Sequence, residues 1–191
     1  MFTRIKARQS GLSLIELILF IVIVGVGIAG VTVTYNTVVR SSADPMARKQ
    51  ALAIAESLLL EIEQQSFTWC DSQDDNVLTA TTAAGCASAA NNQDNVGGPT
   101  PGAETRGNAL NPFDNVADYS GYAAAARDIL GTIYPVAGYA VNVAITRAGA
   151  AAPFAALPLD VVLRIAVTVT GHGETVTLVG YRTRYAPNAA G

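Results

Sequence analysis

The sequence has little of what catalytic and metal-binding sites are built from. Among its 191 residues there is one histidine, His172, and there are two cysteines, Cys70 and Cys86. They form no cysteine–histidine ligand cluster, and the chain has neither a phosphate-binding glycine loop nor a nucleophile elbow. A lone histidine without a nearby Cys or Ser nucleophile is typical of a turn. We therefore predict that the protein is not an enzyme and uses no metal or cofactor.

Charged residues are also scarce, at 14% of the chain, and the formal net charge is -3. Three of the twelve basic residues, Arg4, Lys6 and Arg8, lie in the first eleven residues, which contain no acid. Removing those eleven residues would take away three positive charges and leave a net charge of -6. A balance of this sign does not favour nucleic-acid binding, so we expect no nucleic-acid partner.

A long apolar run follows this basic segment. Between Leu12 and Val39 the one charged residue is Glu16. Leu12 to Val33 supplies 22 residues, or roughly 33 Å of helix. About 20 such residues are needed to span a bilayer core. Because the basic residues that precede the run should stay in the cytoplasm, the rest of the chain is expected outside it.

Three ordinary interpretations of the run compete. A cleaved secretory signal peptide usually has a shorter apolar core followed by a small-residue cleavage site, for which Ala29-Gly30 and Ala43 are the candidates. A plain signal anchor is the second interpretation. A buried core helix is the third, and the length of the run argues against it. None of them explains Glu16, because a carboxylate inside a membrane segment is costly and is a functional candidate by default.

The residues around this carboxylate, Gly11-Leu12-Ser13-Leu14-Ile15-Glu16, resemble the cleavage signal of type IV prepilins and pseudopilins. The likeness covers the basic leader, the glycine, the glutamate and the long apolar helix together, although phenylalanine is commoner than leucine at position 12. It implies that a prepilin peptidase/N-methyltransferase cuts between Gly11 and Leu12 and methylates the new amine of Leu12. Residues 1–11 are then a leader peptide, and residues 12–40 form a helix that crosses the inner membrane and later enters a filament core.

The resemblance also gives Glu16 a role that has a physical reason. Filament subunits bury their apolar helices against one another, and the positively charged N-terminal amine of Leu12 is buried with them. A carboxylate on a neighbouring helix can pair with this amine, and either charge alone in a low dielectric would be very costly. We therefore expect Glu16 to fix the register between subunits. The implied partners are the peptidase, other pilin subunits, inner-membrane pilus assembly proteins and membrane lipid.

Three glycines, Gly25, Gly27 and Gly30, lie inside the apolar run. Glycine in membrane helices commonly allows close helix–helix packing. The other interpretation is a weak point at which the helix can unwind and stretch in a filament. The sequence does not separate the two.

A second helical segment is predicted over residues 44–67. A polar break at 40–43 precedes Asp44-Pro45, which has the pattern of an N-cap followed by proline at the first helical position. Apolar residues then recur at steps of three and four. Such a stripe most often covers a sheet. Its members are Leu52, Ala55, Leu58, Leu59 and Ile62.

Residues 68–134 are expected to be a loop region. Both cysteines lie here, and outside the cytoplasm an even cysteine count predicts a disulfide, here Cys70–Cys86. Four residues between them, Asp71, Asp74, Asp75 and Asn76, raise the alternative of a calcium site. Their spacing does not match an EF-hand and lacks its distal Glu. We therefore interpret them as a solvated turn.

Residues 135–191 are predicted to form an antiparallel sheet of at least three strands. Apolar residues alternate from Tyr139 to Ile145 and again from Val161 to Val169, and the last arm returns from Val176 toward Tyr185. Gly171-His172-Gly173-Glu174 is the predicted hairpin turn. With the helices, this makes the expected fold class α+β, and the resemblance adds a pilin-like layout in which the second half of the helix packs on the sheet.

The body of the chain resembles the biogenesis proteins of mannose-sensitive-haemagglutinin (MSHA) pili of the MshD type. The likeness is carried by Asp44-Pro45, the cysteine pair, Glu104-Thr105-Arg106, the segment 113–121 and the closing hairpin, and it is least in 83–95. It implies a minor pilin that assembles or primes a pilus on the cell surface. A type II secretion pseudopilin and a tip adhesin remain alternatives, because all three share this N-terminus. Neighbouring genes for pilus assembly or for secretion would separate them.

Overall fold

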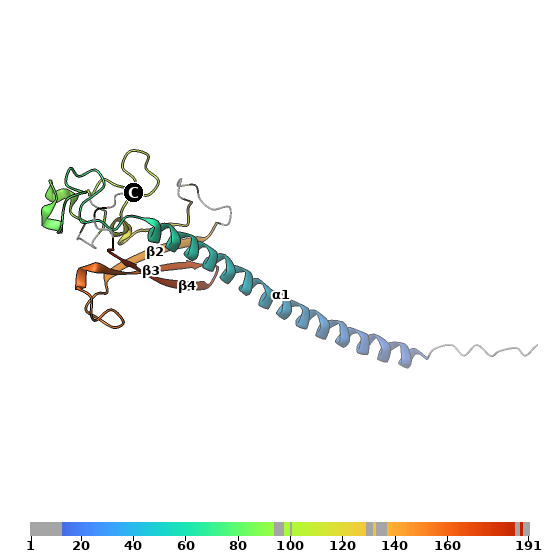
Figure 1. Cartoon of the computed structure of the whole chain (residues 1–191). Helices are drawn as coiled ribbons and strands as arrows, with labels where there is room; N and C mark the ends of the chain where they lie inside the picture. The colour runs from blue at the N-terminus through green and yellow to red at the C-terminus, as the bar shows by residue number, and fades with distance from the viewer. Residues whose placement is uncertain are drawn as a thin grey trace, which may run out of the picture. The chain divides into compact units, whose positions relative to one another are not determined.

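The computed structural model describes residues 13–93, 98–99, 101–128, 132, 137–185 and 188, with backbone alone for 39–44. The predicted cleavage residues Gly11 and Leu12 lie outside the described residues. Figure 1 shows one long helix followed by loops and a sheet. The regular elements are α1 (Leu14–Gln64), β1 (Ala123–Ala125), β2 (Tyr139–Arg147), β3 (Val162–Gly171) and β4 (Glu174–Thr183), together with four short 3₁₀ turns, η1 (Ala83–Gly85), η2 (Ala89–Asn91), η3 (Val116–Tyr119) and η4 (Leu159–Val161).

The apolar and the amphipathic helical segments are both present, as two parts of α1. The expected break at 40–43 is absent, because α1 continues through it with Pro45 inside the helix. Asp44 is therefore not an N-cap, and the helix ends at Gln64 instead of near residue 67. Proline removes one helical hydrogen bond and disfavours helical geometry in the residue before it. The chain divides at this point into two compact units, Met1–Pro45 and Met46–Gly191.

The four strands form one antiparallel sheet in the order β1-β2-β3-β4. The last three were predicted, and the turn between β3 and β4 lies at His172-Gly173, where both φ angles are positive (51° and 83°). Two positive φ angles in succession match the two-residue turn that suits the twist of a hairpin. The prediction for 68–134 was wrong in one respect, since β1 lies within that loop region. The α+β class is confirmed.

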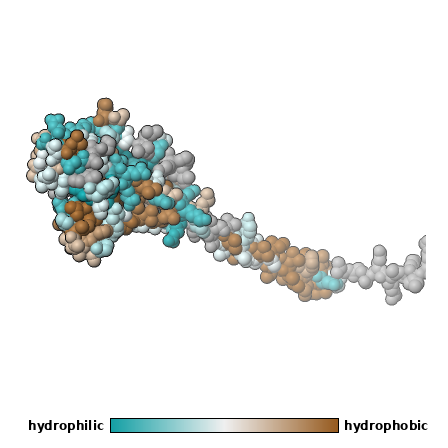
Figure 2. Space-filling model, in the orientation of Figure 1, coloured by the Kyte–Doolittle hydropathy of each residue, from teal (hydrophilic) through white to brown (hydrophobic). Residues whose placement is uncertain are grey.

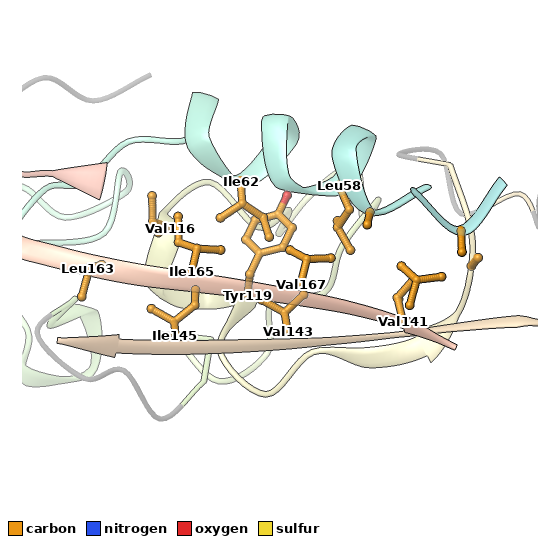
Figure 3. Packing of buried hydrophobic residues seen from close by; sticks show 14 of the residues in the cluster. Leu58, Ile62, Val116, Tyr119, Val141, Val143, Ile145, Leu163, Ile165 and Val167 are labelled. Atoms are coloured by element: carbon orange, nitrogen blue, oxygen red, sulfur yellow. The ribbon is translucent and has the colours of Figure 1, made fainter. Parts of the chain in front are cut away.

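The core lies between the sheet and the second part of α1. Figure 3 shows Leu58 and Ile62 of the helix facing Val143, Ile165 and Val167 of the sheet. The buried helix positions are Ala51, Ala55, Leu58 and Ile62, which are spaced by four, three and four residues as one helix face requires. Leu52 was predicted in this stripe but is 42% exposed, because Ala51 occupies the inward position instead.

The helix approaches the sheet closely at Gly180 of β4. A Cβ atom at this position would clash with the carboxylate of Glu63 and lie 3.0 Å from the Cδ1 atom of Leu59. Glycine therefore leaves the space that the helix occupies. This contact, together with the core, fixes which face of Met46–Gln64 the sheet covers.

Candidate functional site

The first part of α1 presents its apolar side chains to the outside. Leu14–Val38 is 25 residues long and has no buried residue, and its most apolar stretch of 18 residues has a mean hydropathy of 2.8. Figure 2 shows hydrophobic side chains gathered along this part of the helix. By length and composition the segment can cross a membrane. This bears out the coarse expectation of one apolar N-terminal helix that could act as a membrane anchor.

The threonine hydroxyl groups within this segment are already bonded to the helix itself. Thr32, Thr34 and Thr37 each donate a hydrogen bond to the backbone carbonyl four residues earlier, at 2.9, 3.0 and 3.0 Å. Such bonds remove the need for water, which a membrane interior or a dry helix bundle does not supply. The three threonines therefore cost little in an apolar phase.

Glu16 lies in the first turn of α1. Within the described residues its carboxylate has no cationic partner. A carboxylate near a helix N-terminus is favoured by the helix dipole, typically by about 0.3–1 kcal/mol. That gain is smaller than the cost of a charge in a membrane interior. The dipole alone therefore does not account for a carboxylate at this position.

Among the described residues, the glycines of this segment have no packing role. A Cβ atom at Gly25, Gly27 or Gly30 would meet no atom within 4 Å, apart from neighbouring helix backbone. Two of them border a shallow apolar groove on the helix, which is lined by Val26, Gly27, Gly30, Val31, Thr34, Tyr35 and Val38. The chain thus leaves open room for contact with another apolar surface.

Cys70 and Cys86 pair in the structure as predicted. Their Cα atoms are 5.5 Å apart, and the sulfur atoms are joined in a disulfide. Cys70 is fully buried and packs with Val77 and Ala80 in a small second core. The disulfide therefore closes a loop that has its own apolar contacts.

The turn inside this loop is solvated only in part: Asp75 is exposed as the sequence interpretation had it, whereas Asp71 and Asp74 are buried. Asp74 is 3% exposed. Its carboxylate accepts hydrogen bonds from the backbone N–H groups of Asn76, Ala87 and Ser88 and from the side chain of Asn91. Burial raises the pKa of Asp74, but these hydrogen bonds together hold it below its usual value. Asp74 thus connects the turn at Asn76 to residues 87–91 by hydrogen bonds.

A cluster of three carboxylates lies beside the same loop. It joins Asp71, which follows Cys70, to Glu104 and Asp114 from later segments, with one oxygen of each within 4.8 Å of the others. Burial, followed by the charges of Asp118, Asp71 and Asp114, raises the pKa of Glu104 to about 9. Burial also raises the pKa of Asp114. Sequence reasoning grouped Asp71 with its chain neighbours and missed Glu104 and Asp114.

An ion pair holds the segment that carries Glu104 in place. Arg106 donates to both carboxylate oxygens of Glu61 on α1, at 2.7 and 2.6 Å, and to the backbone carbonyl of Arg127 at 3.0 Å. Tyr119 donates to the same Glu61 carboxylate at 2.8 Å. Both members of the ion pair are largely buried. Glu104-Thr105-Arg106 is therefore anchored to the helix by its last residue.

No family model, curated protein or solved structure matches this chain. What its own geometry defines is an α+β protein with an outward-facing apolar helix at the N-terminal end. Its second unit carries a sheet, a disulfide loop and a buried group of carboxylates.

Proposed function

We propose that this chain is a minor type IV pilin, of the MshD type found with MSHA pili. A prepilin peptidase cuts it between Gly11 and Leu12 and methylates Leu12. Residues 12–40 then hold it in the inner membrane, with the rest of the chain in the periplasm, until it joins a pilus. The observation that carries the proposal is the apolar helix whose surface its own chain leaves uncovered and whose first turn contains Glu16.

The uncovered apolar surface is the first argument. Apolar surface exposed to water costs about 25 cal/mol per Å², and every residue of Leu14–Val38 is outside the core. An isolated helix of this kind needs an apolar environment such as a bilayer or other helices of the same kind. A subunit that passes from membrane to filament meets both in turn.

Glu16 is the second argument. In a filament core its carboxylate pairs with the N-terminal amine of Leu12 on a neighbouring subunit. The pair is favourable in only one relative position of the two helices, so it selects the register between them. A plain membrane anchor has no use for a carboxylate in this position.

The glycines are the third argument. Glycine in a helix interior costs about 1 kcal/mol relative to alanine, and the chain contains three within six residues, Gly25, Gly27 and Gly30. Since a Cβ atom at these positions would be tolerated within the chain, the benefit must come from outside it. Close contact with another helix supplies such a benefit.

The assignment as a minor subunit rests on the second unit and on the helix. A major subunit packs against many identical copies, so its surface tolerates little irregularity. Residues 83–112 of this chain are rich in Asn, Ala and Gly, and the first proline is Pro45, whereas major pilins usually carry one earlier in the helix. Both features fit a subunit that is used in few copies.

The N-terminus of the membrane-extracted protein tests the proposal. Intact-mass measurement and N-terminal peptide sequencing should show a chain that begins at methylated Leu12. A strain without the prepilin peptidase should retain residues 1–11. A start near residue 30 or 44 would identify an ordinary signal peptide, and retention of residues 1–11 in wild-type cells would identify a plain anchor; either result overturns the proposal.

A further inference from the structure

Three segments that are distant in the sequence bring their carboxylates to one point. Asp71 comes from the disulfide loop, Glu104 from the segment tied to α1 by Arg106, and Asp114 from the residues just before η3. Asp71 is fully buried and Glu104 is 2% exposed, while Asp114 is half-buried. Like charges at such distances repel strongly away from water, so this arrangement needs either a bound cation or a proton on one of the carboxyl groups.

Four buried oxygens of these carboxylates lack a hydrogen-bond donor among the described residues. They are both carboxylate oxygens of Glu104, Oδ2 of Asp71 and Oδ1 of Asp114, and the carboxyl groups of Glu104 and Asp71 lie within hydrogen-bond reach of each other. The remaining oxygens are used: Asp71 Oδ1 accepts from the backbone N–H of Gln73 at 2.7 Å, and Asp114 Oδ2 accepts from the hydroxyl of Ser72. Buried acceptors are normally satisfied. Unsatisfied carboxylate oxygens from three side chains are the ligands that a site for a hard cation requires.

We propose that Asp71, Glu104 and Asp114 bind one calcium ion. Three atoms that lie within 4.8 Å of one another share a point no farther than about 2.8 Å from each of them, and calcium–oxygen bonds measure about 2.3–2.6 Å. The observed arrangement therefore needs a closure of at most a few tenths of an ångström. Magnesium, at about 2.0–2.1 Å and with strict octahedral geometry, would need a larger one.

The chemistry of the ligands favours the same ion. All three side chains supply carboxylate oxygens, which suit hard cations, whereas zinc and copper sites usually include histidine or cysteine. The described cysteines are joined in the disulfide, and His172 lies at the hairpin turn. Calcium takes six to eight oxygens, as a rule, so water molecules would have to supply the ligands that these three side chains do not.

The site is held in place by contacts that do not involve the ion. The disulfide fixes the start of the Asp71 segment, and the backbone N–H of Asp71 donates to the carbonyl of Asn91 at 2.8 Å. Asp118 accepts from the backbone N–H groups of Asp114 and Asn115, which sets the turn before η3. An ion bound here would therefore cross-link three segments that share no strand or helix.

Metal content and thermal unfolding test the proposal on the full chain in detergent. After removal of metal with a chelator and dialysis, the wild-type protein should bind about one calcium ion per chain by isothermal titration. Extracellular calcium modules have dissociation constants of about 10⁻⁴–10⁻³ M. On that scale roughly 10 mM calcium should raise the unfolding midpoint by about 3–8 °C.

Two variants and a matched control locate the effect. Glu104→Gln and Asp71→Asn should lose the calcium response, and Glu104→Gln without metal should unfold at the wild-type midpoint or above it, because the uncharged amide does not repel Asp71 and Asp114. Asp75→Asn removes an exposed carboxylate from the same loop and should respond like wild type. Equal responses of Glu104→Gln and Asp75→Asn would overturn the assignment.

The single tryptophan gives a measurement that does not depend on variants. Trp69 stands two residues before Asp71, close enough to sensitise the luminescence of terbium, a common substitute for calcium. Wild-type protein should give a terbium signal excited through tryptophan, and calcium should displace it. Absence of both terbium luminescence and calcium binding up to 10 mM would mean that Glu104 holds a proton in place of an ion, and the proposal would fall.

Discussion

The two parts of α1 contain similar apolar residues but use them in opposite ways. Ile62, in the second part, is fully buried against the sheet, whereas Ile28, in the first part, is 63% exposed. The second part has apolar residues on one face and charged residues elsewhere, and the first is apolar on all sides. A helix with one apolar stripe is satisfied by one sheet. A helix that is apolar all round needs surroundings that its own chain does not provide.

This contrast gives the two parts of α1 different roles. The second part stabilises the folded unit, and the first part determines where the protein resides. The stability of Met46–Gly191 depends on the core, the disulfide and the Asp74 turn. None of the side chains of Leu14–Val38 belongs to either hydrophobic core of the described residues. Substitutions in the first part should therefore change membrane or filament behaviour, and substitutions in the second should change unfolding.

The largest effect is expected for Glu16→Ala. The substitution leaves the cleavage glycine intact, so cleavage and membrane insertion should be normal. An unpaired buried charge typically costs about 3–5 kcal/mol, so the unpaired amine of Leu12 should lower incorporation into filaments about 100-fold or more. Immunoblots of sheared filaments and of membranes measure the two pools. Glu56→Ala, at an exposed site in the second part of α1, is the control, and equal incorporation of both variants would rule out the pairing role.

Paired isoleucine substitutions test the contrast most simply. Ile62→Ala removes a fully buried side chain and should lower the free energy of unfolding of the second unit by about 2–5 kcal/mol. Ile28→Ala makes the same chemical change outside the core and should leave that free energy within about 0.5 kcal/mol of wild type. Denaturant unfolding followed by Trp69 fluorescence reports both. A large loss for Ile28→Ala would show that the two parts are not independent.

The disulfide should contribute a somewhat smaller amount. Its cysteines are separated by 16 positions, for which loop entropy predicts about 3 kcal/mol. The double substitution Cys70→Ser/Cys86→Ser should therefore lower stability by about that amount, and reductant should do the same to wild type but nothing further to the variant. Thiol labelling of denatured, unreduced protein from wild-type cells should detect no free thiol; two reactive thiols would contradict export of this unit.

Asp74→Asn should have the smallest of these effects. Replacing the carboxylate by an amide leaves some of its buried donors without an acceptor, at a cost of about 1–3 kcal/mol. Asp75→Asn, next to it but exposed, should be neutral. Hydrogen exchange of residues 76–91 gives the local readout. Identical exchange in the two variants would show that Asp74 stabilises the loop no more than an exposed turn residue does.

The sequence predicted those parts of the fold that depend on local periodicity. Alternation at every second residue located β2, β3 and β4, and the Gly-flanked His172 marked the turn between the last two. The apolar run was found by its length. The pairing of Cys70 with Cys86 followed from the even cysteine count once export was expected.

The remainder depends on tertiary contacts that leave no local signal. Asp44-Pro45 has the pattern of a helix start, yet α1 runs through it. β1 is three alanines, a residue with no preference for strands. Glu104 meets Asp71 because Arg106 binds Glu61 on the helix, and no spacing rule links these positions. The roles of Gly11, Leu12 and Glu16 stay predictions.

The most direct test of the filament assignment is quantitative mass spectrometry of sheared, purified pili. Cleavage after Arg164 and Arg182 releases the peptide of residues 165–182 from the β3–β4 hairpin, which a heavy-labelled copy can count against a major-subunit peptide. We expect this peptide in the filaments as a trace component, and gene deletion should reduce or abolish pili. If it dominates the filaments, the chain is a major subunit. If it is present in membranes but absent from filaments, the proposed function is wrong.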